Sequence, residues 1–146
     1  PPPPPPPPHP RPPMREADLY PPIKSYLEAQ GYTVKAEIGA CDVMALRGAE
    51  PPVIVELKTS FSLALIFQGI ERQTLADAVY IAVPVSSEKG WKLRYKDITR
   101  LCRRLGLGAV HVRAVRTRRG GVLLATSTER RCEASAFFSF VFCKKN

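Results

Sequence analysis

The sequence contains few of the residues that many kinds of enzyme site require. Only two of its 146 residues are histidine, His9 among prolines and His111 in an apolar stretch, so no Ser-His-Asp or Cys-His arrangement is supported. The four cysteines show no C-x-x-C spacing, which argues against a zinc site. We expect them to be reduced thiols, although their even number leaves disulfides open.

Long apolar runs are also missing. No stretch of about 18 apolar residues is present, which argues against a transmembrane helix. The first residues are prolines, in place of the charged and apolar regions of a signal peptide. We therefore expect a cytoplasmic protein with no membrane partner. The segment "RLGLG" at 104–108 follows a helical pattern, so it is interpreted as a helix end and not as a phosphate-binding loop.

Acidic residues are in deficit. The chain carries 22 Lys and Arg against 13 Asp and Glu, a formal net charge of +9. Such an excess favours a polyanion such as nucleic acid as the partner, because basic residues neutralise phosphates and release counterions. A basic surface that only keeps the protein in solution is the alternative, and charge alone does not choose between the two.

Composition divides the chain into three parts. Residues 1–13, "PPPPPPPPHPRPP", are expected to form an extended polyproline II tail that contributes nothing to the fold. Residues 14–128 are patterned as one domain, which is long enough to bury a core. Residues 129–146 contain a Phe-rich block to which we assign no role.

Hydrophobic periodicity predicts the elements of the domain. A helix over 19–30 should end at Gly31, with Pro21 and Pro22 in its first turn or at a kink. This helix and the elements that follow predict an α/β fold, a mixed sheet covered by helices. The later elements are strands 33–38, 41–48 and 51–58, a helix over about 60–77, a buried strand 78–85, a helix over 94–105, and a hairpin of 109–115 with 121–126.

The same periodicity predicts which side chains of the later helices face the core. In the second helix these are Leu63, Ile66, Phe67 and Ile70. In the third helix they are Ile98, Leu101 and Leu105.

The stretch "VIVELKTS", residues 53–60, places two opposite charges at the end of an apolar strand. Strand alternation puts Glu56 and Lys58 on one face. If the preceding hairpin is centred on Ala49, Asp42 lies directly opposite Glu56, with Cβ atoms roughly 4.5–5.5 Å apart. Two carboxylates this close repel each other and are costly to bury, and a divalent cation would relieve both effects.

Magnesium, or manganese in its place, suits such a site. Mg2+ takes hard oxygen ligands, often only one or two carboxylates, and keeps several waters. The ammonium group of Lys58 on the same face would orient water or stabilise charge on a phosphate. These residue types suit metal-dependent hydrolysis of phosphodiesters. The plainer alternative is an ion pair between Glu56 and Lys58 at a strand end, with Asp42 capping a turn.

A family resemblance rests on these residues. "CDVMAL" followed by "VIVELK" resembles the D…(D/E)-x-K core of the PD-(D/E)XK nuclease superfamily, whose restriction-endonuclease-like fold has the same order of helix, three strands, helix and strand. The segment from about Met14 to Gly108 is similar to an uncharacterised bacterial family of PD-(D/E)XK phosphodiesterases. Cys41 stands where the superfamily name implies proline. The resemblance implies a nuclease acting on nucleic acid, DNA before RNA. Many nucleases of this fold are dimers, and whether this chain forms a homodimer stays open.

The resemblance also implies roles for single residues. Asp42 and Glu56 would bind the metal, with the Leu57 backbone carbonyl as a further ligand. Lys58 would be catalytic. Glu16 matches an acidic residue that many members carry on the first helix near the metal, although a favourable charge at a helix N-terminus accounts for Glu16 equally well. The second helix would present residues toward the substrate, namely Gln68, Arg72 and Gln73.

Basic residues accumulate after the fourth strand. Trp91 and Tyr95 are interleaved with them, which suits a groove that follows a nucleic-acid backbone and stacks on bases. The outer face of an amphipathic helix explains part of the set almost as well. The basic residues are Lys89, Lys92, Arg94, Lys96, Arg100, Arg103, Arg104, Arg113, Arg116, Arg118 and Arg119.

The leading hypothesis is a magnesium-dependent nuclease, and two other functions stay open. The first is a nucleic-acid-binding protein that has the nuclease fold but no turnover. The second is an interaction protein whose proline tail is the functional part, in which case deletion of residues 1–13 would abolish its activity. The joint presence of Asp42, Glu56 and Lys58 favours the enzyme.

Overall fold

The computed structural model describes residues 1, 3, 15–39, 41–84, 91–116 and 122–129, with the backbone alone for Ile38, Cys41, 91–93, 113–116 and 122–129. The predictions made for residues 4–13, Lys89, Arg118, Arg119 and 130–146 therefore lie outside the described residues. Among the helices that are described, none combines the length and the apolar composition needed to cross a bilayer.

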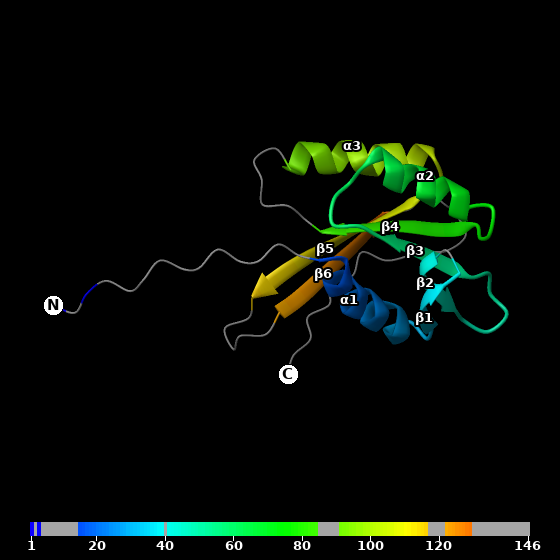
Figure 1. Cartoon of the computed structure of the whole chain (residues 1–146), viewed down its shortest axis with the longest axis horizontal. Coiled ribbons are helices and arrows are strands. Elements are labelled where there is room, and N and C mark those ends of the chain that lie inside the picture. Colours follow the sequence, from blue (N-terminus) through cyan, green and yellow to red (C-terminus); the bar gives the residue numbers. More distant parts are fainter. Residues whose placement is uncertain (2, 4–14, 40, 85–90, 117–121, 130–146) are drawn as a thin grey trace.

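In the described part of the chain, three helices and six strands make up an α/β fold, as predicted (Figure 1). The six strands form one sheet in the order of the sequence, β1 to β6. β3, β4 and β5 run parallel to one another, and the other neighbouring strands are antiparallel. The elements are α1 (Glu16–Ala29), β1 (Thr33–Ile38), β2 (Cys41–Leu46), β3 (Val53–Leu57), α2 (Leu63–Arg72), β4 (Ala78–Pro84), α3 (Trp91–Arg104), β5 (Gly108–Arg116) and β6 (Val122–Glu129).

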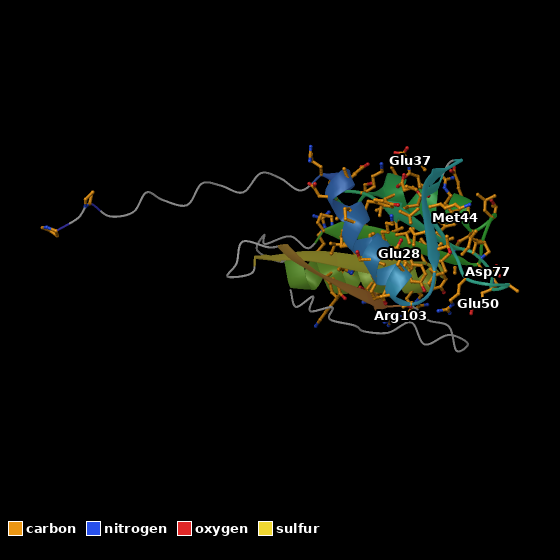
Figure 2. All side chains as sticks on the ribbon, turned by 90° about the horizontal axis from the view of Figure 1, so that it is seen from below. Glu28, Glu37, Met44, Glu50, Asp77 and Arg103 are labelled. Atoms are coloured by element: carbon orange, nitrogen blue, oxygen red, sulfur yellow. The ribbon has the colours of Figure 1, made fainter. Side chains whose placement is uncertain are left out.

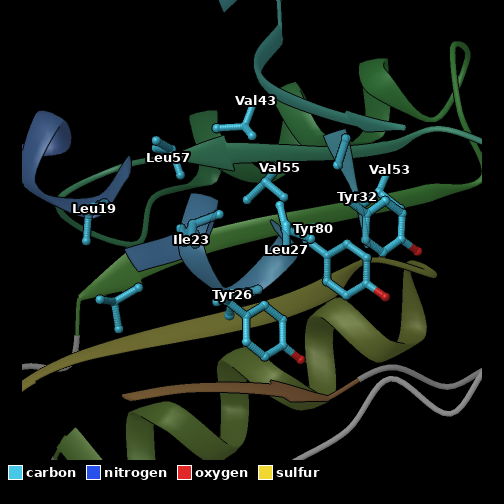
Figure 3. Close-up of a cluster of buried hydrophobic side chains, with 14 residues drawn as sticks. Leu19, Ile23, Tyr26, Leu27, Tyr32, Val43, Val53, Val55, Leu57 and Tyr80 are labelled. Carbon is cyan, nitrogen blue, oxygen red and sulfur yellow. The ribbon is translucent and has the colours of Figure 1, made fainter. Parts of the chain in front are cut away.

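The helices cover both faces of the sheet. α2 and α3 lie together on one face, and α1 lies on the other, where it crosses in front of the strands in the view of Figure 2. Alternation along β3 divides its side chains between these layers. Val55 packs against Leu19, Ile23 and other residues of α1 (Figure 3), whereas Ile54 belongs to the cluster under α2 and α3. Successive residues at the end of β3 are therefore presented to different helices.

α1 begins three residues earlier than the sequence predicted. Its first turn contains Glu16 and Asp18, and Asp18 accepts a hydrogen bond from the backbone N–H of Arg15 at 2.9 Å. Pro21 and Pro22 lie inside the helix, where each removes a backbone donor. The predicted first turn was wrong because acidic residues and this cap stabilise a turn that carries no apolar periodicity.

The inward faces of α2 and α3 differ from the prediction at three positions. Leu63 and Phe67 of α2 are 66% and 56% exposed, and Leu101 of α3 is 42% exposed. On α2, Gly69 is buried against the sheet, where a Cβ atom would lie only 3.1 Å from Leu107. This close approach turns Leu63 and Phe67 outward. On α3, the inward positions are taken by smaller side chains, including that of Cys102, a free thiol that is 1% exposed.

Gly108 marks another close approach, at the start of β5. A Cβ atom at this position would overlap the ring of Tyr80, which is itself 2% exposed. Tyr80 lies opposite Gly108 in the parallel pairing of β4 and β5. The missing side chain therefore creates the space that the tyrosine ring fills.

Candidate functional site

The hairpin of β2 and β3 places Asp42 beside Glu56. The two strands pair in the register expected from a turn centred on Ala49. Continuing this register from the last pair, Val43 with Val55, places Asp42 opposite Glu56. The backbone pairing of β2 and β3 ends at Val43 and Val55. Beyond it, the side chain of Asp42 connects the two chain segments, because its Oδ2 accepts a hydrogen bond from the backbone N–H of Leu57 at 2.8 Å. The paired residues are Val43 with Val55, Met44 with Ile54 and Ala45 with Val53.

Glu56 is a charged residue in the interior. It is 2% exposed, and its side chain is reached from α2 by Arg72, whose Nε donates a hydrogen bond to Oε1 at 2.8 Å. The side chain of Arg72 is 14% exposed, so the whole ion pair is shielded from solvent. Sequence reasoning assigned Arg72 to a phosphate and missed this pair. A buried strand glutamate requires a cation nearby, and that requirement is the signal that points to Arg72.

Burial raises the pKa of Glu56 above its ordinary value. The hydrogen bond and the charge of Arg72 lower this pKa, while the charge and close approach of the Asp42 carboxylate raise it. The result is still a raised pKa. The Arg72 guanidinium group therefore does not offset the combined effect of burial and of the neighbouring Asp42 carboxylate on the pKa of Glu56.

The side chain of Lys58 forms its ion pair with a residue of α1, the helix on the opposite face of the sheet from α2. Lys58 lies one residue beyond β3, where its backbone N–H donates to the carbonyl of Ala82 at 3.0 Å. Its Nζ donates to Oε1 of Glu16, in the first turn of α1, at 3.1 Å. Strand alternation ends at Leu57, so it does not fix the side chain of Lys58 on the face of Glu56. The structure thus pairs Lys58 with Glu16 of α1 and Glu56 with Arg72 of α2.

The oxygen donors at this edge suit a small hard cation. No cluster of three or more His, Cys, Asp and Glu side chains within the described ranges is arranged to hold a metal. Magnesium does not require one, since it commonly binds through one or two carboxylates and fills its other positions with water. Asp42 and Glu56 would supply the carboxylates of such a site, each through the oxygen that accepts no hydrogen bond described here, and the backbone of Leu57 is held next to Asp42 by its N–H. The residues present therefore fit magnesium or manganese.

A contact with substrate was expected for Gln68 and Arg72 of α2 and for Gln73 at its C-cap. Arg72 contacts the carboxylate of Glu56. The side-chain Oε1 of Gln68 is buried without a hydrogen-bond partner among the described residues. Gln73 connects two helices instead, since its Nε2 donates to the carbonyl of Leu105 at 3.0 Å. That bond gives Gln73 a structural role.

Glu37 was missed by the sequence reasoning. It lies on β1 between the pairs Ala36–Val43 and Ile38–Cys41, and so falls next to Asp42 in the ladder. Its φ of 52° is in the left-handed region, which is rare for residues other than glycine. Such backbone conformations are concentrated at functional sites. In the sequence, the nearby Gly39 is the one sign of a tight turn at this place.

The basic residues of α3 whose side chains are described are solvent-exposed. Two aromatic residues were expected among them, of which Trp91 has no described side chain and Tyr95 is not exposed. Tyr95 is partly buried, and its ring contacts the ring of His111 in a T-shaped geometry with centroids 4.1 Å apart. Tyr95 therefore does not offer a face to a nucleic-acid base. The exposed basic side chains of α3 are Arg94, Lys96, Arg100, Arg103 and Arg104.

No family model, curated protein or solved structure matches this chain. The resemblance to PD-(D/E)XK nucleases therefore depends on the residues quoted above.

Proposed function

We propose that this protein is a magnesium-dependent phosphodiesterase that hydrolyses nucleic acid, DNA before RNA, on a restriction-endonuclease-like fold. The observation that carries the proposal is the approach of Asp42 to the buried Glu56, whose pKa stays raised despite its ion pair. The order helix, three strands, helix, strand also supports it, since the same order is typical of the PD-(D/E)XK fold.

In this proposal Asp42, Glu56 and the carbonyl of Leu57 hold the metal. A bound magnesium ion supplies Lewis-acid activation of the phosphate that is cleaved. The chain supplies the other groups. The ammonium of Lys58, whose side chain is 36% exposed, is available to a phosphate oxygen and stabilises the negative charge that grows there as water attacks. Glu16 holds this ammonium in place by its hydrogen bond.

Arg72 supplies a second positive charge. In the structure it neutralises part of the charge on Glu56. Its guanidinium group also has the donor geometry for a phosphate, to which it can offer paired hydrogen bonds. With a metal bound to Glu56, Arg72 would be free to make this contact.

The test is incubation of the protein with plasmid DNA, single-stranded DNA and RNA in magnesium, in manganese and in EDTA. We expect cleavage that requires the metal, and loss of cleavage with retained nucleic-acid binding in Lys58→Ala. Cleavage in EDTA, or full activity of Lys58→Ala, would refute the assigned roles.

The second candidate is a nucleic-acid-binding protein without turnover. The Arg72–Glu56 pair favours it, because Glu56 already has a cation partner. This candidate predicts binding that does not change with EDTA, and no cleavage with either metal. The same incubation therefore separates the two functions.

A further inference from the structure

α3 carries a line of exposed cations along its outer side. Lys96, Arg100 and Arg104 follow one another at intervals of four residues, and Arg103 lies beside them. We call these four residues the α3 ridge. The opposite side of the helix is buried against the sheet, so the ridge faces solvent.

Cations elsewhere in the described part of the chain are mostly neutralised by carboxylates. Lys35 and Arg94 are the exceptions among those with described side chains. Three cations of the ridge lack a carboxylate partner: Lys96, Arg100 and Arg104 take part in none of the ion pairs formed by the described residues. The paired cations are Arg15 with Asp18, Lys24 with Glu28, Arg47 with Glu50, Lys58 with Glu16 and Arg72 with Glu56.

Helix stability does not explain the ridge. Like charges four residues apart destabilise a helix, and the ridge contains two such pairs in sequence, Lys96 with Arg100 and Arg100 with Arg104. Cations in the last turn are favoured by the helix dipole, which accounts for Arg103 and Arg104. It does not account for Lys96 and Arg100, which lie in the middle of the helix. The exposed carboxylate of Asp97, three residues before Arg100, offsets one of the four positive charges. An external anion would offset the others.

α3 starts at the sheet edge that carries the carboxylate site, and the ridge runs from there toward the opposite edge. α3 lies on the same face of the sheet as α2, which supplies Arg72 (Figure 1). It connects the parallel strands β4 and β5, so it starts at the sheet edge where β3 ends and Lys58 follows. From Lys96 to Arg104 the ridge extends about 12 Å, the axial rise of three to four phosphates of one duplex strand at about 3.4 Å each.

We propose that the α3 ridge binds the phosphate backbone of a nucleic acid. The contact is to phosphates only, so it is strongly salt-dependent and independent of base sequence. The choice of nucleic acid rests on the proposed function. The contact itself needs neither metal nor cleavage, and this independence allows a separate test.

The test compares the wild type with Lys96→Gln/Arg100→Gln and with the control Lys24→Gln/Lys35→Gln, which removes the same charge from α1 and β1. Binding of fluorescent duplex DNA and of single-stranded RNA is measured in EDTA at several salt concentrations. Each phosphate contact changes the slope of log K against log [salt] by about 0.9 on duplex DNA, which is worth about eightfold between 1 M and 0.1 M salt. We expect the ridge variant to bind duplex DNA about 60-fold more weakly at 0.1 M salt, with the slope reduced by about 1.8, and the control to bind nearly as the wild type does.

Equal losses in both double variants would overturn the proposal, because they would show an effect of net charge alone. Unchanged binding in the ridge variant would overturn it as well. Binding of the wild type to anionic lipid vesicles but to neither nucleic acid would assign the ridge to a membrane surface instead. Thermal melts check that both variants are folded. Ridge-dependent binding without any metal-dependent cleavage would refute the proposed enzyme and leave the ridge standing.

Discussion

Arg72 and Glu56 form an ion pair with an Nε–Oε1 distance of 2.8 Å, and their side chains are only 14% and 3% exposed. The pKa of Glu56 is nevertheless raised, because burial and the Asp42 carboxylate outweigh the effect of Arg72. Both the stability of the fold and its response to pH should therefore depend on the partners of this one carboxylate.

Removal of the guanidinium group should destabilise the protein. In Arg72→Met, Glu56 stays buried without its cation, and the loss of one partner of a buried pair costs roughly 3 kcal/mol near neutral pH. The variant raises the pKa of Glu56 further, so this loss shrinks as the pH falls through that pKa and the carboxyl group is protonated. Urea unfolding at pH 7.5 and pH 5 measures both effects.

The double variant Arg72→Met/Glu56→Gln is the control, because it removes both charges and should recover most of the stability. A loss in Arg72→Met that is independent of pH, or is equal in the double variant, would show that the ion pair is not its cause.

Replacement of Asp42 by asparagine should separate stability from activity. The amide introduced by Asp42→Asn still offers an oxygen to the backbone N–H of Leu57, but the substitution removes the charge that repels Glu56. We expect the pKa of Glu56 to fall, the free energy of unfolding at pH 7 to rise by about 1 kcal/mol, and metal-dependent cleavage to disappear. Glu28→Gln, at the far end of α1, is the matched control and should cleave normally. A strongly destabilised Asp42→Asn would contradict this account.

His111 should make the fold sensitive to acid. Burial lowers the pKa of His111 to about 4, from 6.5 in the unfolded chain. Between these values the unfolded state binds more protons, so the stability is complete above about pH 6.5 and is lost as the pH falls toward 4, by roughly 3 kcal/mol in all. His111→Leu should flatten the dependence of the unfolding free energy on pH in this window. An equally steep dependence in the variant would assign the acid sensitivity to other groups.

Gly108 should not tolerate a side chain. In Gly108→Ala the new methyl group overlaps the buried ring of Tyr80, and the ring cannot move freely in a packed core, so we expect a loss of roughly 2–3 kcal/mol. Gly48→Ala provides the contrast, since the space there is open and only its φ of 53° is unfavourable for alanine, at a cost of roughly 1 kcal/mol. Chemical denaturation of both variants compares these costs, and a Gly108→Ala protein as stable as Gly48→Ala would contradict the packing described here.

The order of elements and the register at the site could be predicted from the sequence, because both follow from local rules. Alternating and continuous apolar runs identify the strands, and the turn centred on Ala49 fixes how β2 pairs with β3. The inward face of α2 could not be predicted, since residues 63–67 are all apolar and leave the helix free to present either side. Only the close packing of Gly69 on the sheet decides which side is buried.

The ion-pair partners of Glu56 and Lys58 could not be predicted from the sequence either. Glu56 and Lys58 are two residues apart, and the sequence suggests that they share surroundings. In the structure one is paired from α2 and the other from α1, because β3 ends between them. Such pairings depend on how helices are placed on the two faces of the sheet, which no local pattern encodes.

The bond between Glu16 and Lys58 joins positions 42 residues apart and depends on a helix turn whose residues 15–18 are all exposed. Terminal turns of helices open at much lower free energy than the core of a protein. A brief opening of this turn would set the lysine free while every strand of the sheet stayed in place. The ammonium group is thus held by one of the least stable parts of the domain, and its release requires no unfolding of the rest.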